Sequence, residues 1–156
     1  VGSQAALCYD GAWVSATMVI ADSNFDCTSN AVRFSLPVTG GSVAMANVVV
    51  ATGNLGLSFA QLVAGTSVSV TGGSITTAAD AVRFSKSATD SPMSVSGVKI
   101  TSEGFGVNYE TGPVIRSDLT IEDSVVSRGA GSTEWINIAG QTDTSVEISG
   151  SWLKRH

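Results

Sequence analysis

The sequence has very little of the residue types that most reaction classes need. Its 156 residues include one histidine, His156, and two cysteines, Cys8 and Cys27. A single terminal histidine excludes a histidine-based metal centre, a Ser-His-Asp triad and a Cys-His pair. Two cysteines are too few for a disulfide scaffold, and their spacing leaves open one bridge or two reduced thiols. We therefore expect neither a bound metal ion nor a cofactor.

Basic residues and long apolar runs are scarce as well. Lys and Arg total 8 against 13 Asp and Glu, which gives a net charge of −5. A nucleic-acid-binding protein needs a basic surface that neutralises phosphates, so this class is excluded. No apolar run approaches the roughly 18–20 residues of a membrane span, so we expect no membrane insertion. The chain shows no signal peptide and begins at Val1, which favours an excised piece of a longer protein.

What the sequence does have is an internal repeat of about 25 residues. The segment Ala31–Ser35 recurs unchanged as Ala81–Ser85, and Gly56–Ala60 has the same apolar-polar-apolar core midway between them. Gly106–Tyr109 and Trp135–Ile138 continue the series after 25 and 29 further residues. A fixed period of this length is typical of a solenoid, whose repeats bury their apolar faces by stacking.

Three columns of equivalent positions run in step with this repeat. Two apolar columns, two residues apart, have the alternation of a strand with one buried face. The first is Met18, Val43, Val68, Met93, Leu119 and Val146, and the second is Ile20, Met45, Val70, Val95, Ile121 and Ile148. Two residues further on, the third column contains only Gly, Asn or Asp: Asp22, Asn47, Gly72, Gly97, Asp123 and Gly150. These residue types tolerate a left-handed backbone, so the column predicts a tight corner between two strands.

This pattern resembles the right-handed parallel β-helix of the pectin-lyase-like superfamily, which includes pectate lyases, polygalacturonases and bacteriophage tailspikes. The resemblance covers residues 16–155 and rests on the corner column and the apolar columns beside it. It implies an all-β chain of five to six coils, with about 25 residues and three short strands per coil. Residues 16–156 would form the β-helix domain, and residues 1–15 would form an N-terminal cap or the end of a preceding coil. An antiparallel sandwich, the alternative, would not need a fixed period.

Outward positions on the first predicted sheet are polar in every coil. They are Arg33, Ser58, Arg83, Asn108 and Asn137. In enzymes of the resembled superfamily this face carries clustered acids, and the column here has none, which disfavours catalysis on it. We predict that Arg33, Arg83, Asn108 and Asn137 bind carbohydrate, helped by Tyr109, Trp135 and Trp152; the alternative is a merely solvated face.

Candidate catalytic acids lie on the second predicted sheet instead. Glu122 and Glu147 fall on adjacent repeats, and Asp123 adjoins Glu122. Two carboxylates at such a separation could hydrolyse a glycosidic bond or hold calcium. Acids on a solvated strand are the commoner explanation for this pattern.

The third predicted sheet places apolar side chains where water is expected. Val49, Val125 and Trp152 alternate with buried positions, which indicates an outer face covered by other subunits. The alternative is scattered surface hydrophobes, which are normal in soluble proteins. Together with the resemblance, this predicts a homotrimeric segment of a bacteriophage tailspike or tail fibre that binds a host cell-surface polysaccharide, located in the virion or outside cells. The alternative is a polysaccharide hydrolase or lyase, or a fragment of one. An ice-binding solenoid is disfavoured, because the outward columns are not regular threonine rows.

Overall fold

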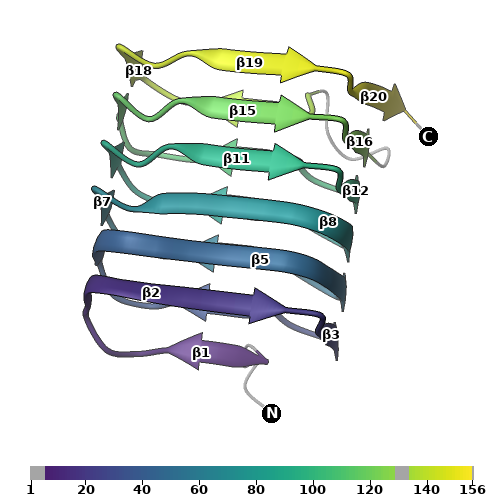
Figure 1. Ribbon diagram of the computed structural model, residues 1–156, viewed down its shortest axis with the longest axis horizontal. Coiled ribbons are helices and arrows are strands. Elements are labelled where there is room, and N and C mark those ends of the chain that lie inside the picture. The colour runs from purple at the N-terminus through teal and green to yellow at the C-terminus, as the bar shows by residue number, and fades with distance from the viewer. Residues whose placement is uncertain (1–5, 129–133, 156) are drawn as a thin grey trace.

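The chain folds into a parallel β-solenoid of about six coils (Figure 1). The computed structural model describes residues 6–128 and 134–155. The first five residues of the predicted cap and His156 therefore lie outside the described residues. Within the described part all regular structure is strand, every strand pairing is parallel, and partners lie 25 to 29 residues apart. The predicted all-β solenoid with its 25-residue repeat is confirmed.

One side of the solenoid is a six-stranded sheet, called sheet A here, with one three-residue strand per coil. Its strands are β1 (Leu7–Tyr9), β4 (Val32–Phe34), β6 (Leu57–Phe59), β9 (Val82–Phe84), β13 (Val107–Tyr109) and β17 (Ile136–Ile138). The repeated Ala-Val-Arg-Phe segments therefore stack directly on one another.

A continuous fourteen-stranded sheet forms the other sides. Its second face contains β2 (Trp13–Ala21), β5 (Val38–Thr52), β8 (Ser67–Thr77), β11 (Met93–Ser96), β15 (Leu119–Glu122) and β19 (Val146–Ser149). Its third face contains β3 (Asn24–Cys27), the ends of β5 and β8, β12 (Lys99–Ser102), β16 (Val125–Arg128) and β20 (Trp152–Arg155). A further short side joins sheet A to the second face through β7 (Val63–Ala64), β10 (Ala88–Thr89), β14 (Val114–Ile115) and β18 (Gln141–Thr142). These two-residue strands come in addition to the three strands per coil that the sequence predicts.

The Gly/Asn/Asp column is the corner between the second and third faces. All six residues have a positive φ, from 47° at Asp123 to 64° at Gly72 and Gly97. A second left-handed corner, between the short strands and the second face, is absent from the sequence prediction. Its members are Ser15, Gly40, Gly65, Asp90, Arg116 and Asp143. The residue types do not reveal this corner in the sequence, because two of its members, Ser15 and Arg116, are not types that favour the left-handed region.

Backbone groups beside the second corner are satisfied by a ladder of buried hydroxyls. The amide of Thr66 donates to Ser91 Oγ, that of Ser91 to Ser117 Oγ, and that of Ser117 to Thr144 Oγ1, at 3.0–3.2 Å. A buried N–H without a partner is costly, so each coil supplies an acceptor to the coil before it.

Aromatic rings stack along the inside of sheet A. Tyr9, Phe34, Phe59, Phe84 and Tyr109 follow one another with ring centroids 4.5–5.3 Å apart and interplanar angles of 6–14°. The parallel register puts equivalent side chains one strand spacing apart, so the rings are held nearly face to face. The sequence assigned Tyr109 a role in ligand contact, and this is wrong: the side chain is fully buried in the stack.

Tyr109→Phe should raise the free energy of unfolding by about 1 kcal/mol. The Tyr109 hydroxyl is buried and has no hydrogen-bond partner within residues 6–128 and 134–155, and burial raises its pKa well above the ordinary 10. An unsatisfied buried polar group costs about 1–3 kcal/mol, and phenylalanine keeps the ring while removing that group. Urea denaturation of both proteins tests this. A loss of stability would mean that the hydroxyl has a partner in solution.

Candidate functional site

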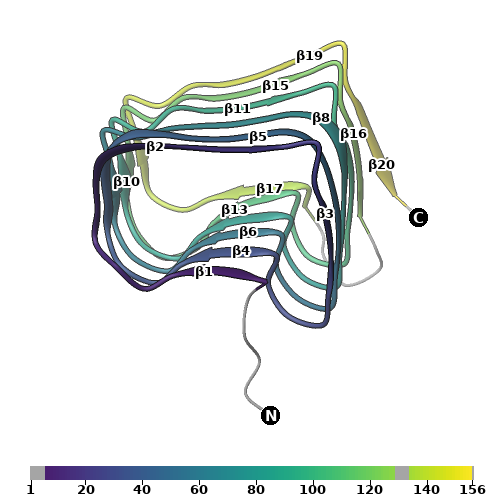
Figure 2. The same cartoon turned by 60° about the horizontal axis from the view of Figure 1, so that its bottom comes forward.

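The predicted polar column runs along the outer side of sheet A in unbroken register. Arg33 pairs with Ser58, Ser58 with Arg83, Arg83 with Asn108, and Asn108 with Asn137. This side of the sheet is not an open surface, since Ser58 and Asn108 are only 3% and 5% exposed. Figure 2 shows why: the loop after the third face swings outward past sheet A before the chain turns back into it.

Asp80, from one of these loops, organises the buried part of the column. Its Oδ1 accepts the amide of Phe105 at 2.8 Å, and its Oδ2 accepts Asn108 Nδ2 at 2.8 Å. Asn137 Nδ2 then donates to Asn108 Oδ1 at 2.8 Å. Asp80, Asn108 and Asn137 thus form one hydrogen-bonded chain across three coils, which fixes the two asparagine side chains.

Arg83 is held by a second acid. Its guanidinium donates to both carboxylate oxygens of Glu110, with Nε 3.0 Å from Oε2, and Nε also lies 3.9 Å from Asp80 Oδ2. The hydrogen bond from Arg83 holds the pKa of the Glu110 carboxyl below its usual range, and the same contact raises the pKa of Arg83. A carboxylate with a lowered pKa is poorly suited to donate a proton as a general acid.

We expect the stabilisation from this pair to disappear in acid. Because the pKa of Glu110 is lower in the folded chain than its ordinary 4.5, the contribution is fully present above that value. It is lost as the pH falls through the folded-state pKa. Glu110→Gln should therefore lower the melting temperature more at pH 7 than at pH 2. The same difference at both pH values would contradict the assignment of the pair.

The sequence pattern assigned no role to Asp80 or Glu110, although each adjoins a sheet A strand. Asp80 comes just before the Ala81–Ser85 segment, and Glu110 directly follows Tyr109. The outward column itself contains no acid, as predicted, and these two acids reach it from the flanking loops. Their oxygens already bind Phe105, Asn108 and Arg83, so they act on the column by holding it in place.

At the N-terminal end of the column the side chains are less constrained. Among the described residues Arg33 forms no ion pair. Its neighbour Cys8 donates to Asp10 Oδ1 at 3.3 Å, and hydrogen bonds from Ser35 and Cys8 lower the pKa of Asp10. Both cysteines are free thiols in the structure, so the alternative of a Cys8–Cys27 bridge is not realised there.

The predicted catalytic acids lie elsewhere, on the second face and its corner. Glu147 pairs with Thr120 and Glu122 with Ser149, which puts the two glutamates diagonally on adjacent strands. Both side chains are exposed, as is Asp123, which occupies the left-handed corner at φ 47°. Within the described part of the chain, neither glutamate side chain has a hydrogen-bond partner.

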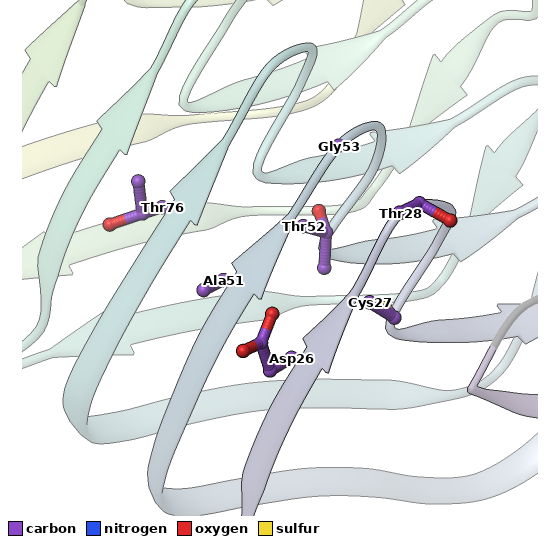
Figure 3. Close-up of a pocket in the computed structure, with 7 residues that line it drawn as sticks. All are labelled: Asp26, Cys27, Thr28, Ala51, Thr52, Gly53 and Thr76. Atoms are coloured by element: carbon purple, nitrogen blue, oxygen red, sulfur yellow. The ribbon is translucent and has the colours of Figure 1, made fainter.

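A shallow depression of about 530 Å³ lies where the third face ends (Figure 3). It is lined by Asp26, Cys27, Thr28, Ala51, Thr52, Gly53 and Thr76. The sequence analysis did not single out these residues. The depression depends on which side chains are neighbours on adjacent coils. Those neighbours are known only once the strand register is known.

Apolar side chains are exposed on three sides of the solenoid. Val14 is 67% exposed on the short side, Val19 is 66% exposed on the second face, and Val49 and Trp152 are 44% and 68% exposed on the third face. Val125 is half-buried. The outward apolar positions that the sequence predicted are therefore present, and Trp152 stays largely exposed although the Lys154 ammonium lies 5.9 Å from its ring centroid.

The described residues provide neither a metal-binding cluster nor a membrane-spanning helix. Residues 6–128 and 134–155 contain no cluster of three or more metal-ligating side chains. They also include no helix with the length and apolarity needed to cross a bilayer.

No family model, curated protein or solved structure matches the chain. Any function must therefore be argued from the solenoid and its surfaces.

Proposed function

We propose that this chain is a rigid, trimeric segment of a bacteriophage tailspike or tail fibre that binds a polysaccharide of the host cell surface. The observation that carries the proposal is the polar ladder on sheet A, in which the half-buried Arg33, Arg83 and Asn137 stand in one register. The buried Ser58 and Asn108 lie between them and support the ladder from within. A polysaccharide offers hydroxyl groups at regular intervals, and arginine and asparagine supply the donors and acceptors that such groups need. We further propose that the solenoid is right-handed and belongs to the pectin-lyase-like superfamily.

The ladder is pre-organised for binding. Asp80 holds the buried Asn108, which in turn accepts a hydrogen bond from Asn137, and Glu110 holds Arg83. Little side-chain entropy of Asn137 and Arg83 therefore remains to be lost when a ligand binds. Among the described residues the Arg33 side chain forms no hydrogen bond or ion pair, and Asn137 Oδ1 accepts no hydrogen bond, so both can bind a ligand. Because the acids near the ladder are engaged, we propose binding without cleavage at this face.

Binding of purified capsular and O-antigen polysaccharides, measured by biolayer interferometry, tests the proposal. Arg33→Ala should weaken binding about tenfold or more, since hydrogen bonds to charged groups contribute about 1.5–3 kcal/mol. Lys99→Ala, an exposed cation on the third face, is the matched control and should bind normally. Equal affinities of the two variants, or no binding of any polysaccharide by the wild type, would refute the proposal. Release of reducing ends, abolished by Glu147→Gln, would instead establish the hydrolase alternative.

The trimer is proposed from the exposed apolar side chains. Val14, Val19 and Trp152 are each about two-thirds exposed, and a symmetric assembly is the simplest way to cover them. Light scattering over a range of concentrations should give about 47 kDa, three times the 15.8 kDa chain mass. A concentration-independent 15.8 kDa would rule out the trimer.

A further inference from the structure

The depression on the third face arises because one coil carries two very small residues between larger ones. Asp26, Ala51 and Thr76 are register partners on β3, β5 and β8 and stand in a row across three coils. Two residues further along the middle coil, Gly53 also lines the depression and lies against the backbone of Thr28 in the first coil. Ala51 and Gly53 therefore form the floor of a notch, with Asp26 and Thr28 on one side and Thr76 on the other (Figure 3).

The polar groups around this notch are free, unlike those on sheet A. In the described part of the chain, no hydrogen bond or ion pair engages the side chains of Asp26, Thr28 or Thr76. The Thr52 hydroxyl, in contrast, donates a hydrogen bond to the carbonyl oxygen of Leu55 at 3.3 Å. The notch thus presents one carboxylate and two hydroxyls above an apolar floor formed by the methyl group of Ala51.

Its dimensions suit one ring of a sugar chain. Asp26 and Thr76 are two strand spacings apart, about 10 Å, and the volume of about 530 Å³ falls within the roughly 300–1,000 Å³ of ligand sites. A carboxylate accepts two hydroxyl groups at once, and hydrogen bonds to a charged acceptor are roughly twice as strong as neutral ones. The apolar floor would contact the carbon face of the ring.

We propose that this notch is a second carbohydrate subsite, which takes a single neutral or amino-substituted pyranose of the bound polysaccharide. The proposal rests on the proposed function and adds a site to it. Asp26 is the one charged residue lining the notch, so an anionic sugar such as a uronic acid is repelled and an amino sugar is attracted. The notch therefore favours neutral and amino sugars over anionic ones. The ladder on sheet A, which contains arginines, does not share this preference.

Amide chemical-shift titration of the ¹⁵N-labelled chain tests the subsite. The probes are the methyl pyranosides of mannose, glucose, galactose and N-acetylglucosamine, with glucosamine as the cationic probe and glucuronate as the anionic one. We expect saturable shifts at Thr28, Gly53 and Thr76 with at least one neutral or amino probe and none with glucuronate. Asp26→Ala should weaken this binding about tenfold or more. Ala51→Gln, which fills the notch, should abolish it.

Matched variants keep the outcome interpretable. Ala44→Gln makes the same substitution on the same strand β5 but on the second face, and Asp143→Asn removes an exposed acid from another corner; both should titrate like the wild type. Absence of shifts with every probe, or shifts that survive Ala51→Gln, would overturn the subsite. If polysaccharide binding nevertheless stays sensitive to Arg33→Ala, the proposed function stands and only the subsite fails. If the wild type binds no polysaccharide, the proposed function fails instead.

Discussion

Phe59→Ala is expected to lower the free energy of unfolding by about 3–5 kcal/mol. Phe59 is fully buried and stacks between Phe34 and Phe84, at centroid distances of 5.0 and 4.9 Å. The strands on either side are held in register by the backbone ladder, so neighbouring rings cannot close the cavity. The cost therefore includes both the lost transfer free energy and the cavity itself.

Urea denaturation followed by circular dichroism measures this effect. The matched control is Phe105→Ala, because Phe105 is only half-buried in a loop and lies outside the ring stack. It should cost clearly less than Phe59→Ala. A loss below about 1 kcal/mol for Phe59→Ala would show that the stack is loosely packed in solution.

Gly73→Ala is expected to destabilise the chain by more than about 2 kcal/mol. Gly73 has a φ of +75°, and a Cβ there would lie 2.3 Å from the carbonyl oxygen of Val48 in the preceding coil. The left-handed conformation alone costs about 1–2 kcal/mol for a residue with a Cβ. The clash adds to this, because Val48 is held by its own neighbours and cannot move away.

Two other glycines separate the two causes. Gly97 has a φ of +64° but its Cβ would meet nothing nearer than 4.0 Å, so Gly97→Ala should show the strain alone. At Gly11, where nothing lies within 4 Å and the φ is not left-handed, alanine should be neutral or slightly stabilising. Gly11→Ala should therefore have the highest melting temperature of the three variants, Gly97→Ala a lower one and Gly73→Ala the lowest. Equal losses for the last two would mean that the coils are not packed as closely as the structure has them.

The sequence by itself determined the coil. Burial repeats with the period of the backbone, so the 25-residue spacing, the apolar columns from Met18 to Leu119 and from Ile20 to Ile121, and the corner from Asp22 to Gly150 could all be read from residue types. The last members of the two columns, Val146 and Ile148, depart from the prediction, since they are 43% and 42% exposed. The polar column from Arg33 to Asn137 followed for the same reason, since alternate residues of a strand point outward.

Only the tertiary structure decided what those columns touch. The Asp80 and Glu110 carboxylates reach Asn108 and Arg83 through loop conformations, which no periodicity reports. The notch beside Asp26 exists because register sets a small residue of one coil between larger residues of the two coils next to it. Contacts of this kind depend on loop paths and side-chain rotamers across 25 or more residues of sequence. The architecture was therefore readable from the chain, while its binding surfaces became visible only once the coils were stacked.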